Sequence, residues 1–175
     1  MTVTKRFKFD LPALRVLENE HQYLSYLMGE WHEIVLGFER DAYSIEEGRE
    51  ALRELRKWIV EFIDPYKKHT EKEEEFLFPL LALYVGDEQG PVQATEEEHE
   101  EIDAYIGHFL HHTLRGIEGL TMQEMKDVVR DAGEAFEVIT VHFIKEESVL
   151  FPMVNNVLRI EGQDRLYEQL YTSIL

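Results

Sequence analysis

The sequence spells one phrase twice. HTEKEEEFLFP begins at His69 and HFIKEESVLFP begins at His142, and each has a Glu four residues after the His, a second Glu, and Phe-Pro at the same distance. Residues four apart lie on one face of an α-helix, so His69 can reach one site together with Glu73, and His142 together with Glu146. We therefore interpret each copy as half of the ligand set of a two-metal centre.

Long stretches of the chain carry apolar residues at spacings of three and four, which is typical of amphipathic helices, and no strand pattern competes. Start signals divide these stretches into four helices. They run from a cap at Asp10 to about residue 40, from SIEE at 44–47 toward residue 80, from GP at 90–91 or TEEE at 95–98 to near RGIEG, and from TMQE at 121–124 toward residue 151. Short connections favour antiparallel neighbours, so we expect an all-α, up-down-up-down four-helix bundle.

Three prolines fall within these helical patterns. Pro65 lies inside the second one and is expected to kink it, because proline lacks the amide hydrogen and its ring crowds the preceding turn. Pro79 and Pro152 are expected to end or bend their helices just past each repeated phrase.

The length of 175 residues is close to that of one domain, so we treat residues 1–175 as a single domain. The bundle core is expected over about residues 10–152. A tail of residues 153–175 is expected to hold a short helix from Gln163 to Ser173. The aromatic FKF segment at 7–9 and this tail are expected to cover the bundle or to join a second subunit.

The duplication extends beyond the opening phrase, because ENEHQYLSYL around His21 resembles EEEHEEIDAYI around His99. The chain therefore reads as two similar helical hairpins. At ~1.5 Å per residue, His99 and His142 lie at similar heights in the bundle, and the two histidines of the first hairpin differ by less than about two turns. We predict six metal ligands on the four helices: His21, His69, Glu73, His99, His142 and Glu146.

Simpler interpretations exist for each residue alone. A lone buried His is more often a core residue with satisfied hydrogen bonds, and Glu-rich runs such as EKEEE are usually solvated, so that Glu73 or Glu74 would lie at the surface. The duplicated spacing, with a His on each of the other two helices, favours the metal site.

Four imidazoles and two carboxylates without a thiolate suit iron, manganese or zinc. If Glu73 and Glu146 bridge two metals, each metal has two His nitrogens and two carboxylate oxygens, and a bridging oxide or hydroxide adds a fifth ligand. Six-coordinate iron then keeps one position open, whereas tetrahedral zinc would be overfilled. The count therefore favours two iron ions, with manganese as the alternative.

Composition excludes several other classes of protein. The chain has no Cys, so disulfides, thiolate nucleophiles and Cys-ligated metal sites are excluded. Its net charge of -18 opposes binding to nucleic acid or to an anionic membrane. The first residues, MTVTKRFKFD, have no apolar signal-peptide core, and no run is long enough for a membrane span. We expect a soluble cytoplasmic protein.

At these residues the sequence resembles the hemerythrin-like, or HHE cation-binding, family, over about Asp10 to Pro152. The resemblance implies a four-helix bundle around a non-haem di-iron centre. It also implies that the four histidines are terminal ligands and that Glu73 and Glu146 are bridging carboxylates. Oxygen-carrying members have a fifth His four residues after the third-helix His, and here that position is Asp103. The chain therefore resembles the bacterial and regulatory branch more than the dedicated oxygen carriers.

The expected activity is binding of, or reaction with, O₂, NO or a peroxide, in sensing, carriage, detoxification or iron-centre repair. Alternatives are a metal-responsive module that a protein partner recognises, and a di-iron redox enzyme such as a ferroxidase. The rings of Phe76, Phe78, Phe143 and Phe151 are expected to keep water from the centre. The remaining histidines are not expected to be ligands: His32 is too far along its helix, and we expect His108, His111 and His112 to be exposed.

Overall fold

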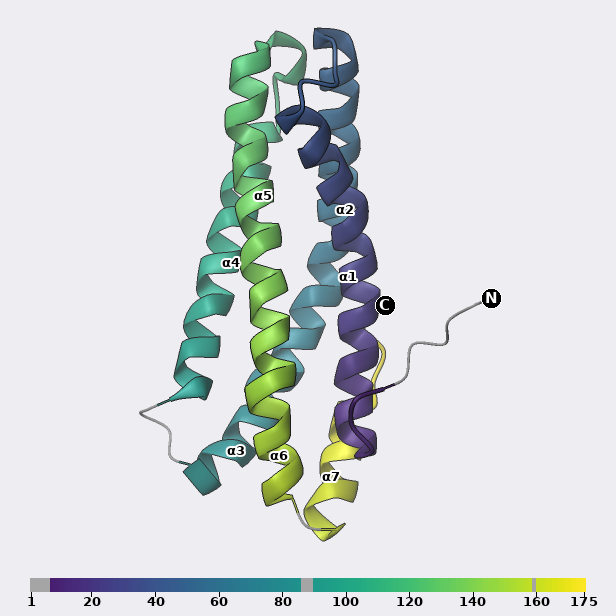
Figure 1. Ribbon diagram of the computed structural model, residues 1–175, viewed down its shortest axis with the longest axis vertical. Helices are drawn as coiled ribbons and strands as arrows, with labels where there is room; N and C mark the ends of the chain where they lie inside the picture. Colours follow the sequence, from purple (N-terminus) through teal and green to yellow (C-terminus); the bar gives the residue numbers. More distant parts are fainter. Residues whose placement is uncertain (1–6, 86–89, 159) are drawn as a thin grey trace, which may run out of the picture.

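The computed structural model describes residues 7–85, 90–158 and 160–175. Four long helices run alternately up and down, and the short helices α3, α6 and α7 gather at one end of the bundle (Figure 1). The long helices are α1 (Pro12–Glu39), α2 (Ile45–Lys72), α4 (Pro91–Thr113) and α5 (Met122–Lys145). The short elements are η1 (Glu73–Leu77), α3 (Phe78–Val85), η2 (Ile117–Gly119), η3 (Glu146–Leu150), α6 (Phe151–Val157) and α7 (Ile160–Leu170). The described ranges contain no strand, so the predicted all-α bundle is confirmed.

Helix α2 begins as its sequence predicts. The hydroxyl of Ser44 accepts a hydrogen bond from the backbone N–H of Glu47 (3.2 Å), and the Glu47 carboxylate accepts one from the backbone N–H of Ser44 (3.0 Å). This pair is the predicted capping box. At the start of α5, the Thr121 hydroxyl likewise accepts from the backbone N–H of Glu124 (3.1 Å).

The predicted cap at Asp10 is wrong. Helix α1 begins at Pro12, and Leu11 occupies the N-cap position without a side-chain cap. The carbonyl of Leu11 already accepts a hydrogen bond from the backbone N–H of Leu14 (3.0 Å), which is the donor that an N-cap side chain would bind. The Asp10 carboxylate instead pairs with Arg15 (3.3 Å).

The two competing starts of the third long helix are resolved in favour of Gly90-Pro91. Gly90 has φ of 101°, a conformation that residues with a Cβ rarely adopt, and α4 begins at the next residue. The alternative start at TEEE lies within the helix. Helix α4 ends at Thr113, close to RGIEG as expected.

None of the three prolines ends a helix, and a kink or bend at these positions stays a prediction. Helix α2 continues through Pro65 to Lys72. Pro79 and Pro152 are each the second residue of a short helix that directly follows a π-helical turn, and these helices continue to Val85 and Val157. The regular helix is instead interrupted earlier, by the π-helical turns η1 and η3.

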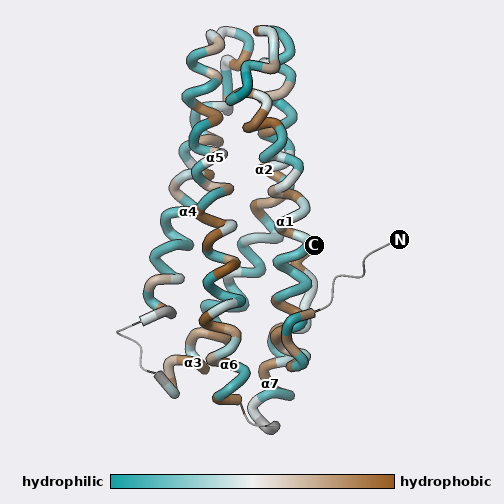
Figure 2. Tube along the Cα trace, in the orientation of Figure 1, coloured by the Kyte–Doolittle hydropathy of each residue, from teal (hydrophilic) through white to brown (hydrophobic). Residues whose placement is uncertain are grey.

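The core consists of two apolar clusters on either side of a polar layer. The larger cluster fills the bundle from Leu24 to the α1–α2 turn and includes Trp31 and Phe62. The smaller one joins the base of α1 to α3, α6 and α7 and includes Phe78 and Phe151. Hydrophilic and hydrophobic residues are interspersed along each long helix, as expected for amphipathic helices packed in a bundle (Figure 2). The polar layer between the clusters contains the candidate metal site.

Both ends of the described chain pack on the bundle. The ring of Phe9 meets that of Phe151 edge to face, with centroids 5.9 Å apart. Helix α7 lies against α1, and Leu170 and Ile174 are buried. The predicted C-terminal helix is thus present, but it starts at Ile160 and ends at Leu170. No helix in the described ranges is both long and apolar enough to span a membrane.

Candidate metal centre

The six predicted ligands meet inside the bundle. Their potential ligand atoms form two groups of four, and within each group these atoms lie within 4.8 Å of one another. The first group contains His21 and His69, the second contains His99 and His142, and both contain Glu73 and Glu146. All six side chains are buried. Because the two carboxylates belong to both groups, they occupy the position that bridging ligands require.

The π-helical turns direct the carboxylates inward. Each turn begins at a candidate ligand, Glu73 or Glu146, and the backbone N–H of the residue five positions later bonds back to its carbonyl. In a regular α-helix, residues five apart point about 140° away from each other. The wider turn brings Glu73 and Phe78 to the same side, so both are buried, and it does the same for Glu146 and Phe151.

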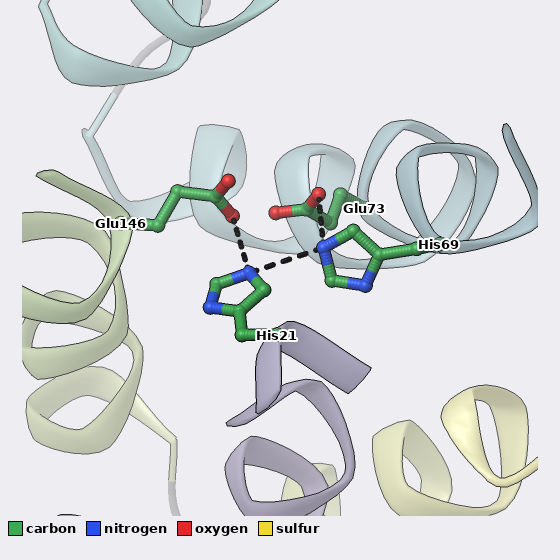
Figure 3. A group of neighbouring side chains, drawn as sticks. All are labelled: His21, His69, Glu73 and Glu146. Atoms are coloured by element: carbon green, nitrogen blue, oxygen red, sulfur yellow. Dashed lines mark hydrogen bonds and ion pairs between the residues drawn. The ribbon is translucent and has the colours of Figure 1, made fainter. Parts of the chain in front are cut away.

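The ligand atoms converge on a shared space. Figure 3 shows the carboxylates of Glu73 and Glu146 pointing toward each other, with the rings of His21 and His69 directed at them. The Nε2 atoms of His21 and His69 lie 3.1 Å apart, and His69 Nε2 lies 3.1 Å from Glu73 Oε1. In the second group, the Nε2 atoms of His99 and His142 lie 3.0 Å apart.

A carboxylate holds the other ring nitrogen of every candidate ligand histidine. Glu147 lies 3.3 Å from Nδ1 of His21, and Glu74 lies 2.8 Å from Nδ1 of His99. The other two contacts are Glu20 to His69 Nδ1 (2.9 Å) and Glu98 to His142 Nδ1 (2.7 Å). A carboxylate accepting from Nδ1–H leaves the Nε2 lone pair directed at the centre, which is the arrangement of a metal-binding imidazole.

These outer carboxylates follow the internal repeat. Glu20 and Glu98 each precede the histidine of their own helix, yet each binds the histidine of the next long helix and a lysine three residues beyond it. The lysines are Lys72, which lies 2.5 Å from Glu20, and Lys145, which lies 2.5 Å from Glu98. Sequence reasoning missed this shell. The repeats do contain a signal for these carboxylates, because a Glu stands directly before the first histidine of each hairpin and a second Glu follows in each repeated phrase.

The electrostatics of the first group favour a bound cation. Burial lowers the pKa of His21 to about 4. Burial would also lower the pKa of His69, but Glu73 and the hydrogen bond to Glu20 outweigh it and raise this pKa to about 9. Burial would raise the pKa of Glu73, but His69 outweighs it and lowers this pKa to about 2. The pair of histidines therefore retains one proton beside an ionised carboxylate, and a metal ion would replace that proton.

The donor set fits two cations. Within the described chain, the buried carboxylate oxygens of Glu73 and Glu146 have no hydrogen-bond donor other than the candidate ligand histidines. Two carboxylates buried side by side in an apolar bundle are costly without further positive charge. With every Nδ1–H donated outward, the facing Nε2 atoms of each pair also need a shared positive charge, either a proton or a metal ion. A cation in each group satisfies both requirements.

Aromatic rings enclose the centre as expected, with one exception. Phe143 stacks on His21 with centroids 4.0 Å apart, and Phe78 stacks on His99 at 6.1 Å. Phe151 is fully buried against His21, whereas Phe76 is only half-buried and covers less of the site. The shell therefore comes mainly from three of the four predicted phenylalanines.

Tyr66 is a further residue that sequence reasoning missed. It is buried one turn before His69, its ring centroid lies 6.4 Å from that of His99, and its hydroxyl has no hydrogen-bond partner among the described residues. Burial, followed by the charge of Glu73, raises the pKa of Tyr66 well above its usual value. Its equivalent in the repeat is Ile139, so this polar group is present on one side of the centre only.

Asp103 is exposed and belongs to neither candidate group. Glu74, and not Asp103, holds Nδ1 of His99, so the described contacts favour a solvent-facing Asp103 side chain.

His32 is half-buried and stacks on Phe136 with centroids 3.7 Å apart, outside both groups. The histidines at 108, 111 and 112 are exposed, as predicted.

Replacing Glu98 with Gln is expected to weaken metal binding by about 10- to 100-fold, because Glu98 orients His142 and increases its basicity. The matched control is Glu97→Gln, an exposed neighbour on α4 that bonds only to Gln93 among the described residues. Competition with a metal chelator measures both affinities. Equal affinities in the two variants would contradict a role for Glu98 in the centre.

Comparison with known proteins agrees with this geometry. No curated protein and no solved structure matches the chain. The family model of the hemerythrin HHE cation binding domain matches residues 13–154, which include all six predicted ligands and the four outer carboxylates. Since this match covers most of the chain, the protein belongs to the hemerythrin HHE cation-binding family.

Proposed function

We propose that the protein holds two iron ions on the six buried ligands and that it binds, or reacts with, a small molecule such as O₂, NO or a peroxide. Iron is preferred because four imidazoles, two bridging carboxylates and a bridging oxide or hydroxide would leave about one open position on each six-coordinate ion. Such a pair supplies reversible changes of oxidation state and exchangeable ligand positions. Sensing, carriage, detoxification and iron-centre repair are all uses of this chemistry.

The observation that carries the proposal is a groove between α1 and α5 that reaches the centre. Its volume is about 300 Å³, and His21 and Glu147 line its inner end. Ser25 and Gly29 line it on α1, and Thr140 lines it on α5. None of the other three candidate ligand histidines lines a pocket described for the chain. A small molecule therefore has a route to the His21 side of the centre.

The chain's own residues control what happens along this route. Phe143 lies in the groove and stacks on His21, so its ring limits the entry of water and larger molecules. Glu147 holds His21 in place through Nδ1 and is itself paired with Lys8 (2.9 Å). On the opposite side, the unpartnered hydroxyl of Tyr66 is a hydrogen-bond donor for a ligand at the His99–His142 position.

The direct test is a stopped-flow mix of the anaerobic, reduced, iron-loaded protein with O₂ and, separately, with NO. A rapid change in the visible spectrum with at least one gas is expected, since each needs only one open position and a route. Protein that holds two irons but reacts with neither gas would contradict the proposal.

The groove itself is tested by Gly29→Phe. A Cβ at Gly29 would meet no atom within 4 Å, so the new ring has room to enter the groove, and slower binding of azide or NO is expected. The matched control is Gly107→Phe, the equivalent position in the repeat, which also has open space but lines no described groove. If both variants bind at the wild-type rate, the route lies elsewhere.

A second candidate function is a metal-responsive interaction module, and the C-terminal tail favours it. Lys72 donates hydrogen bonds to the Thr172 carbonyl and to Glu20, and Glu20 holds His69 (2.9 Å). The tail is thus linked to a candidate ligand through three successive contacts. Limited proteolysis should then cut the tail faster in metal-free than in metal-loaded protein. Equal rates would exclude this candidate.

A further inference from the structure

A second group of histidines lies outside the buried centre, on the exposed surface of α4. His108 and His112 are four residues apart, both are exposed, and their Nε2 atoms lie 2.9 Å apart. In the buried centre, the corresponding distances within the two histidine pairs are 3.1 and 3.0 Å. The exposed pair therefore repeats the spacing of the candidate ligand pairs.

A carboxylate orients this pair as well. Asp131 on α5 accepts from Nδ1 of His108, and it is the more shielded partner, with a side chain 20% exposed against 59% for His108. Nδ1–H donation to Asp131 leaves the Nε2 lone pair of His108 directed at His112. The four buried histidines are held by carboxylates in the same way, and this arrangement fixes the tautomer that binds metal.

We propose that His108 and His112 form a second, solvent-exposed cation site for a divalent late transition-metal ion, Ni²⁺ or Cu²⁺, with water as the remaining ligands. Two Nε2 atoms 2.9 Å apart are close enough to share one ion. For a given nitrogen and oxygen site, Ni²⁺ and Cu²⁺ are among the divalent first-row ions that bind most tightly.

The site is independent of the buried centre. His108 follows His99 by nine residues on α4, which is about 14 Å along the helix. An exposed site with two protein ligands exchanges its ion readily, unlike a buried site with four. The net charge of -18 attracts cations to the surface and thus favours its occupancy.

The test is a titration of Cu²⁺ into tag-free protein whose buried centre is already loaded with metal, followed by calorimetry and by electron paramagnetic resonance. One equivalent of Cu²⁺ with nitrogen ligands is expected. His108→Ala and His112→Ala should each abolish this binding, and Asp131→Asn should weaken it about tenfold. The control is His111→Ala, an exposed histidine on the same helix, which should bind Cu²⁺ like wild type.

Two results would overturn the proposal. One is Cu²⁺ binding by His112→Ala with wild-type affinity. The other is an equal loss in His111→Ala, which would show non-specific binding by the histidine-rich surface. Since all of these side chains except Asp131 are well exposed, the variants are expected to fold, and unchanged metal content of the buried centre verifies this.

Discussion

Replacing His69 or His142 with Ala is expected to remove most of the metal from the purified protein. Each variant loses one of the four donors that surround a cation. Loss of an outer partner alone weakens a metal site by about 10- to 100-fold, so loss of a ligand should weaken it further. Because Glu73 and Glu146 belong to both groups, each variant is also expected to bind the other cation more weakly.

Elemental analysis of tag-free protein measures this loss. His111→Ala is the control, because His111 is exposed and belongs to neither buried group. Circular dichroism should show that all three variants keep their helices. Wild-type metal content in His69→Ala and His142→Ala would show that these residues are not ligands.

Removing the metal is expected to lower the melting temperature by at least roughly 5 °C. A ligand present at 100 times its dissociation constant stabilises the folded state by about 2.7 kcal/mol, and each kcal/mol shifts the melting temperature of a chain this long by about 2–4 °C. The physical reason lies in Glu73 and Glu146. Both are fully buried and ionisable, and without a cation they repel each other with only the candidate ligand histidines as partners within the described chain.

Differential scanning calorimetry of chelated protein, before and after addition of Fe(II), measures this linkage. The melting temperature should return to its original value when the ion is restored. A melting temperature that is unchanged after complete metal removal would mean that the folded state gains nothing from ligation at this centre.

Periodicity and capping were sufficient to predict the bundle. The Ser44 box and the Thr121 cap are local signals, and the hydrogen bonds that they predict are formed. The predicted cap at Asp10 was wrong because an N-cap depends on where the first turn closes, and the first helical hydrogen bonds, from the amides of Leu14 and Arg15, close on the carbonyl of Leu11. Pro79 does not end its helix, because proline is tolerated early in a helix as well as after one.

The six candidate ligands could be selected from the repeat, but their partners could not. Spacing places Glu73 on the face of His69, whereas it does not reveal that Glu20 reaches across from α1 to the same ring. Contacts between helices depend on their rotation and height, which a single sequence does not specify. The π-helical turns were missed for a related reason. They place Glu73 and Phe78 on the same buried side, and the packing that such a placement serves is not encoded in local propensity.

The central claim is that one chain holds two cations on these six residues. The most direct measurement is the number of metal ions per folded chain, determined by elemental analysis of tag-free protein reconstituted anaerobically with Fe(II) and freed of excess ion. The account predicts two irons per chain. A folded chain that retains one iron or none would contradict it.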